Sequence, residues 1–199
     1  MSRLDQFEMD IARAKDLVGL GQSIGSMTSG IVDASDLYRA ALVQAVAAWD
    51  RYIHGLVLDR AVDIVLGRLD VQTTHKIGLG LSTIRVLMQT TNPAEQELVA
   101  RSLVADRLTR ETFQRPDDVG SALAMVGIRA IWSTAFEDAG QAKIAVGVIV
   151  DRRNRIVHAC DCDPVQPGSV LTISSGDAQS AIGVLENTAS AVHSVCTSS

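Results

Sequence analysis

The clearest helical pattern in the chain is SDLYRAALVQAVAAWDRYIHGLVLDRAVDIVLGRL, residues 35–69. It contains no proline, and its apolar residues recur mostly at steps of three and four, as on the buried side of an α-helix. This apolar stripe consists of Leu42, Val46, Trp49, Ile53, Leu56 and Ile64. Ser35 is of the residue type that caps helix N-termini. The stretch therefore predicts one long helix whose apolar side must pack against other helices.

Further helices are predicted downstream of this stretch. Asn92 followed by Pro93 is typical of a helix start. That helix should run toward Phe113 and end before Pro116, because the residue before a proline disfavours helical backbone. The segment VGSALAMVGIRAIWSTAF, residues 119–136, predicts another helix.

The last third of the chain predicts two more helices. Residues 144–150, IAVGVIV, are rich in β-branched side chains and on composition alone suit a buried strand. A helix from about Gln141 to Cys160 fits the surrounding polar pattern better, and residues 169–174 suit extended backbone. Residues 174–195 predict a closing helix. Its apolar seam alternates four- and three-residue steps through Ala178, Ile182, Leu185, Ala189, Val192 and Cys196.

These patterns predict an all-α fold, an antiparallel bundle of about five helices. A chain of 199 residues suits one compact domain. We expect its core within residues 35–197 and a helical extension in residues 1–30.

The amino-acid composition excludes several classes of function. The chain has 18 Lys and Arg against 23 Asp and Glu, a net charge of −5, which excludes a broadly basic coat for nucleic acids but leaves room for a local basic site. Aromatic residues make up 4%, too few for a base-stacking platform. The three cysteines form no complete disulfide framework. No apolar stretch has the length of a membrane span, so we expect a cytoplasmic protein without a membrane partner.

The segment DRRNRIVH, residues 151–158, concentrates the groups that carry chemistry. Guanidinium groups bind phosphate oxygens bidentately, and a histidine exchanges protons near neutral pH. Asn154 and His158 are four apart and share a helix face, whereas Arg153 and His158 are five apart. Either the helix is irregular there, or two copies of the segment meet across a two-fold axis. The alternative is a solvated helix end whose arginines interact with the helix dipole.

The run RRNRIVHACD resembles the Arg-polar-x-x-x-His signature of the HEPN superfamily, all-helical domains that include many metal-independent ribonucleases. The earlier helix LVQAVAAWDRYIHGLV is similar to that of the RiboL-PSP type of HEPN domain, in which an Asp, an aromatic residue and a His follow one another. Here these are Asp50, Tyr52 and His54. The resemblance implies a HEPN-like bundle and an active site on the later segment.

The resemblance also implies roles for individual residues. Arg153 and His158 would be catalytic and Asn154 would support them, while Arg152 and Arg155 would contact the RNA backbone. RNA supplies its own nucleophile, the 2′-hydroxyl. His158 would act as base or acid, and Arg153 would stabilise the charge that develops on phosphorus. Arg152 is an alternative for the motif arginine, at a spacing one residue longer.

Three further residues, Asp50, His54 and Asp161, are candidates for supporting the motif residues. Asp50 and His54 are four apart on an apolar helix, so each should be hydrogen-bonded. They either pair with each other or a neighbouring helix to fix packing, or lie behind or beside the Arg153–His158 cleft. Asp161 follows His158 closely and either orients a histidine or arginine, or belongs to a loop.

Metal and cofactor sites are not predicted. Residues 158–162 carry His158, Cys160 and Cys162, but Cys-x-Cys is tighter than the usual zinc spacing. The glycines near residues 19–30 and 78–80 are not followed by Gly-Lys-Ser/Thr, so no phosphate-binding loop is predicted. His75 suits a loop or a helix end.

These inferences lead to one functional hypothesis and its alternatives. The first is a homodimeric, metal-independent endoribonuclease of HEPN type, a hydrolase of the toxin–antitoxin or defence kind, with RNA as substrate and an antitoxin or regulatory protein as further partner. The alternative is a non-catalytic HEPN module that binds RNA or a nucleotide, or a regulatory protein-interaction domain.

Overall fold

The computed structural model describes residues 1–71, 77–166 and 168–198, and these residues form eight helices and no strand. The predicted all-α bundle is thereby confirmed. Cys162 and Val170 form an isolated antiparallel bridge, which is the only extended pairing in the described ranges. The position of His75 lies outside the described residues.

The helices are α1 (Arg3–Met27), α2 (Ser35–Val65), α3 (Leu81–Gln89), α4 (Pro93–Leu108), α5 (Pro116–Met125), α6 (Ile131–Ala135), α7 (Ala139–Ala159) and α8 (Ser175–Ser198).

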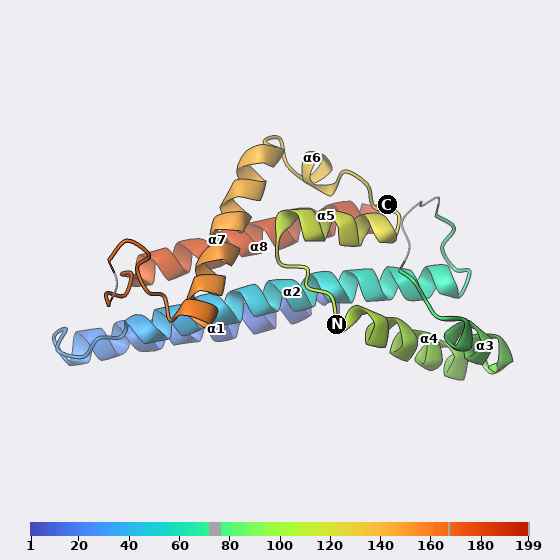
Figure 1. Cartoon of the computed structure of the whole chain (residues 1–199), viewed down its shortest axis with the longest axis horizontal. Coiled ribbons are helices and arrows are strands. Elements are labelled where there is room, and N and C mark those ends of the chain that lie inside the picture. Colours follow the sequence, from blue (N-terminus) through green and yellow to red (C-terminus); the bar gives the residue numbers. More distant parts are fainter. Residues whose placement is uncertain (72–76, 167, 199) are drawn as a thin grey trace.

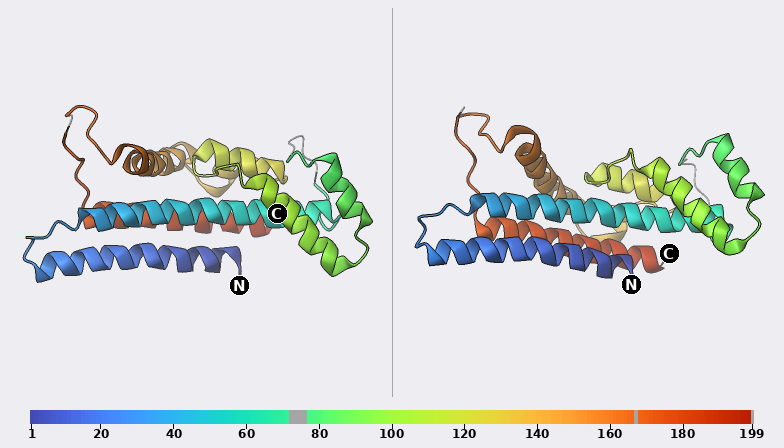
Figure 2. Two further views of the ribbon diagram at one scale, coloured as in Figure 1. Left: turned by 60° about the horizontal axis from the view of Figure 1, so that its bottom comes forward. Right: turned by 90° about the horizontal axis from the view of Figure 1, so that it is seen from below.

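Three long helices form the body of the molecule. α1, α2 and α8 lie side by side along its longest dimension, with α1 antiparallel to the other two (Figures 1 and 2). α7 crosses α2 and α8 at a steep angle, and α5 and α6 lie on the same side as α7 (Figure 1). α3 and α4 project from the end of α2 that is remote from the α7–α8 loop (Figure 1). α2 contacts α1, α4, α5, α7 and α8, so it organises the bundle.

The burial of α2 and α8 follows the sequence pattern. On α2, the large stripe residues from Leu42 to Leu56 are buried, whereas Ile64 is only partly buried. Alanines at 41, 45, 48 and 61 are also buried, which lets neighbouring helices approach α2 from more than one side. All six seam residues predicted on α8 are buried. The apolar periodicity therefore identified both core helices.

The α2 cap differs from the prediction. The N-cap is Ala34, and Ser35 is the first helical residue. Asp33 accepts hydrogen bonds from the Ser35 backbone N–H at 2.8 Å and from its hydroxyl at 3.0 Å. An aspartate two residues earlier thus takes the role that we assigned to Ser35.

The middle of the chain is more broken than predicted, which is why the described residues contain more than about five helices. Asn92 caps α4 by accepting the N–H groups of Ala94 and Glu95, but α4 ends at Leu108 rather than near Phe113. Residues 119–136 are not one helix: α5 and α6 are separated where Gly127 and Ala130 have φ of 86° and 52°. A left-handed residue ends an α-helix because it redirects the backbone N–H and C=O groups.

The two ends of the chain both contribute to the bundle. α1 begins with a capping box between Ser2 and Asp5, and Phe7, Ile11 and Val18 on it are buried against the other long helices. The helix predicted from about Gln141 is confirmed as α7, and the strand alternative for residues 144–150 is wrong. Among the described helices, none combines the length and apolar character needed to cross a membrane.

Candidate functional site on helix α7

The predicted motif residues lie around one small cavity between α7 and the loop that joins α4 to α5. We call this loop, residues 109–115, the α4–α5 loop. The cavity has a volume of about 320 Å³. It is lined by Thr112, Gln114, Arg115, Asp118, Val150, Arg153, Asn154 and His158. The three residues to which the motif assigns catalytic roles are therefore brought together in one chain.

α7 supplies the motif side of the cavity. Arg153 Nη1 donates a hydrogen bond to Asn154 Oδ1 at 3.0 Å, which fixes the orientation of both groups. Within the described part of the chain, the buried Nε of Arg153 has no hydrogen-bond partner, so this guanidinium retains an unused donor. His158 is exposed in the last turn of the helix.

The five-residue spacing of Arg153 and His158 needs no irregular helix. α7 is continuous from Ala139 to Ala159, and the cavity extends around its side far enough to include both residues. Asn154 lies between them in angle around the helix. The spacing alone therefore does not require a second copy of the chain.

The α4–α5 loop forms the opposite wall and is held by α2. Phe113 donates its backbone N–H to Asp50 Oδ1 at 2.6 Å, and Gln114 Nε2 donates to Asp50 Oδ2 at 3.3 Å. Trp49 Nε1 donates to the backbone oxygen of Gln114 at 3.2 Å. Gln114 lines the cavity itself, so Asp50 lies directly behind one wall of the site.

Asp50 and His54 also interact with each other. His54 Nδ1 lies 2.9 Å from the backbone oxygen of Asp50 and 3.4 Å from its Oδ1. Burial raises the pKa of Asp50, but hydrogen bonds from His54, Phe113 and Gln114 lower it more, so the net pKa is below its ordinary value. Burial lowers the pKa of His54, whereas bonding to Asp50 raises it above its ordinary value overall. The His54 ring packs on Phe113 with a centroid distance of 4.3 Å.

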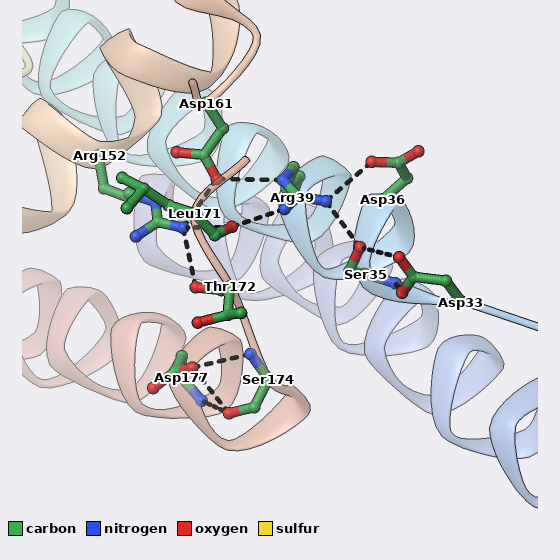
Figure 3. A network of polar contacts seen from close by, with 10 residues as sticks. All are labelled: Asp33, Ser35, Asp36, Arg39, Arg152, Asp161, Leu171, Thr172, Ser174 and Asp177. Atoms are coloured by element: carbon green, nitrogen blue, oxygen red, sulfur yellow. Dashed lines mark hydrogen bonds and ion pairs between the residues drawn. The ribbon is translucent and has the colours of Figure 1, made fainter. Parts of the chain in front are cut away.

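Arg152 does not line the cavity and belongs instead to an internal ion-pair network (Figure 3). Its Nη2 donates to Asp161 Oδ2 at 2.7 Å and to the Thr172 oxygen at 3.0 Å. Arg39 Nε donates to the same Asp161 oxygen at 3.0 Å, and its Nη2 donates to the Leu171 oxygen at 2.7 Å. Asp161 is fully buried. It orients two arginines rather than a histidine, and Arg152 has a structural partner in this network.

Arg155 occupies another side of α7. It is half-buried and shares a helix stripe with Ile144 and Val148, which precede it by eleven and seven residues. Those two apolar side chains are 60% and 64% exposed. The same stripe carries Asp151, which pairs with Arg115. It lies next to His158 in angle around the helix, whereas Arg153 lies on the far side of α7.

The cysteines lie apart from this cavity. Cys160 and Cys162 are exposed and Cys196 is buried, where burial raises the pKa of its thiol to about 11. Across the described ranges, no group of three or more His, Cys, Asp or Glu residues is placed to hold a metal ion.

Sequence reasoning missed Gln114, Arg115 and Arg39. Gln114 and Arg115 lie at the predicted end of the helix that starts at Pro93, just before Pro116. Arg39 is on α2, 122 residues from Asp161, and no local pattern links them. A polar segment directly before Pro116 was the one signal for a loop wall.

Comparison with family models, with curated proteins and with solved structures found no match. The fold and the cavity define the class: an all-α protein with a polar site that combines arginine, asparagine and histidine on one helix.

Proposed function

We propose that this protein is a metal-independent endoribonuclease of HEPN type. The observation that carries the proposal is the shared cavity of Arg153, Asn154 and His158 in an all-helical bundle, on the segment whose sequence resembles the HEPN motif. A guanidinium beside a histidine supplies a phosphate-binding cation and a proton-transfer group. A toxin or defence role, with an antitoxin or regulatory partner, rests on the resemblance alone.

The reaction needs only groups that these residues and RNA provide. His158 removes the proton of the ribose 2′-hydroxyl, the 2′-oxygen forms a bond to phosphorus, and the bond from phosphorus to the 5′-oxygen breaks. The departing 5′-oxygen takes a proton from water or, in a homodimer, from the protonated His158 of the second copy, so the products are a 2′,3′-cyclic phosphate and a 5′-hydroxyl. Arg153 stabilises the negative charge on the phosphorane, and Asn154 holds Arg153 in place through their 3.0 Å hydrogen bond.

A homodimer would complete this chemistry. Each chain brings one histidine to the site, whereas the reaction has one proton to remove and one to deliver. The exposed Ile144 and Val148 lie on a stripe with Asp151 and Arg155, next to His158 in angle around the helix, and packing two such stripes together would bring two copies of α7 face to face. The composite cleft would then hold two histidines.

Cleavage of end-labelled RNA in the presence of EDTA tests the proposal. Wild type should release products with cyclic phosphate ends, and Arg153→Ala and His158→Ala should abolish them while folding is retained. Arg85→Ala, an exposed arginine on α3, is the matched control and should cleave like wild type. Equal activity in wild type and both site variants would remove the assigned site.

A second candidate is a regulatory protein-interaction domain. The observation that favours it is the outer surface of α3, where Leu81 and Met88 are 86% and 78% exposed. Apolar residues gathered on one exposed helix are typical of a protein-binding surface. If the protein binds RNA without cleaving it, and Arg153→Ala abolishes that binding, the non-catalytic RNA-binding module is favoured instead.

A further inference from the structure

Arg115 is an arginine of the cavity that belongs to neither motif. It comes from the α4–α5 loop and lines the same cavity as Arg153, which comes from α7. Its backbone precedes Pro116 and is extended, with φ −74° and ψ 146°, as expected before proline. The loop is fixed to α2 through Asp50 and Trp49, so Arg115 starts from a rigid base.

The partner of Arg115 is a surface carboxylate on α7. Arg115 Nη2 lies 2.7 Å from Asp151 Oδ1, and the two side chains are 53% and 56% exposed. Pairs as exposed as this are weak and exchange partners readily. The pair engages only one of the three guanidinium nitrogens, and a guanidinium presents a planar fork that matches phosphate oxygens.

The charges around the cavity are balanced as the structure stands. Arg115 and Arg153 carry two positive charges, and Asp118 in the wall and Asp151 at the ion pair carry two negative ones. A site that binds a polyanion gains affinity from net positive charge. Releasing Arg115 from Asp151 would present its positive charge to a ligand.

We infer that Arg115 is a second phosphate-binding residue of the site and that Asp151 restrains it. An RNA phosphate displaces the Asp151 carboxylate, so that Arg115 and Arg153 hold the strand from opposite walls. This inference rests on the proposed function, because it takes RNA as the ligand. Asp151 thereby sets the affinity of the site without touching the reacting atoms.

Binding of a fluorescent 2′-O-methyl oligoribonucleotide tests this inference, because the probe lacks the nucleophile and is not cleaved. Arg115→Ala should weaken binding about tenfold, as expected for the loss of one charge-assisted hydrogen-bond pair. It should also reduce the slope of log affinity against log salt by roughly 0.7. Asp151→Ala should bind more tightly than wild type.

The two variants break the same ion pair, which makes them matched controls. If the ion pair were merely structural, both variants would change RNA affinity equally. That result would overturn the role of Arg115, and so would an Arg115→Ala variant that binds RNA like wild type. If Asp151→Ala binds the oligonucleotide no more tightly than wild type, the proposal that Asp151 restrains Arg115 is overturned. Parallel cleavage assays separate the two proposals: if wild type cleaves RNA and His158→Ala does not, a failure of Arg115→Ala to change binding overturns this inference alone. If wild type neither binds nor cleaves, both fall.

Discussion

Asp50 on α2 accepts the backbone N–H of Phe113 at 2.6 Å, although 63 residues separate them in the chain. This bond fixes the α4–α5 loop to the central helix, and the same carboxylate also receives the side chain of Gln114. A partly buried residue of α2 thus positions one wall of the cavity. Asp50 therefore lies behind the cavity wall and also pairs with His54, whereas His54 packs on Phe113 and does not line the cavity.

Asp50→Ala should destabilise the protein and disturb the cavity. The substitution leaves the buried Phe113 N–H without an acceptor, which typically costs about 1–3 kcal/mol. Urea unfolding followed by circular dichroism measures the loss. Asp106→Asn, at an exposed position on α4, is the control and should leave the midpoint unchanged. An Asp50→Ala midpoint equal to that of wild type would show that the loop is held by other contacts.

The Asp50–His54 pair should make stability depend on pH in a defined window. The pKa of Asp50 is lowered by folding, so its contribution is present above its unfolded pKa of about 3.9 and is lost as pH falls through the folded value. The pKa of His54 is raised, so its contribution is complete below its unfolded pKa of about 6.5 and is lost as pH rises through the folded value.

The difference in unfolding free energy between wild type and His54→Gln should therefore be largest from about pH 4 to about pH 6.5 and smaller above that range. Denaturant melts at a series of pH values measure it. A difference that grows steadily toward pH 9 would contradict the assigned direction for His54.

The sequence predicted the features that depend on residues close together in the chain, and it did not predict those that depend on residues far apart. The seam from Ala178 to Cys196 was readable because helical burial repeats within a few residues. The early end of α4 was not, because it depends on a hydrogen bond from the Phe113 backbone to Asp50, which is 63 residues away in the chain. Likewise the sequence identified the motif residues on α7. It did not identify the other wall of the cavity, because that wall is a loop whose conformation is determined by tertiary packing.

Asp161→Asn should be strongly destabilising. The carboxylate is fully buried between Arg39 and Arg152, and removing one partner of a buried ionic cluster costs about 3–5 kcal/mol. Asn tolerates the left-handed backbone of residue 161, where φ is 55°, so the substitution changes mainly the charge. The shift in urea midpoint measures the effect. Asp163→Asn in the same loop is the control, and equal small shifts in both would contradict a central role for the cluster.

Gly127→Ala should destabilise the break between α5 and α6. The glycine has φ of 86°, and an added Cβ would lie 2.9 Å from the Cβ of Val71. A positive φ and a contact this short each disfavour a side chain. Thermal melts should show a lower Tm for this variant. Gly183→Ala on α8, where nothing lies within 4 Å, should instead keep or raise the Tm because alanine favours helix interiors.

Val148→Glu should convert the protein to a monomer if the exposed stripe on α7 forms the interface of a homodimer. Val148 is 64% exposed and borders an open surface pocket, so a charge there should leave folding intact. Two facing stripes would bury that charge against its own copy, which is unfavourable. Light scattering coupled to size-exclusion chromatography measures the mass. Leu98→Glu, at a similarly exposed position on α4 (70%), is the matched control and should not change the mass. A wild type that is already monomeric at micromolar concentration would contradict the composite cleft, and cleavage would then have to proceed with the single histidine of one chain.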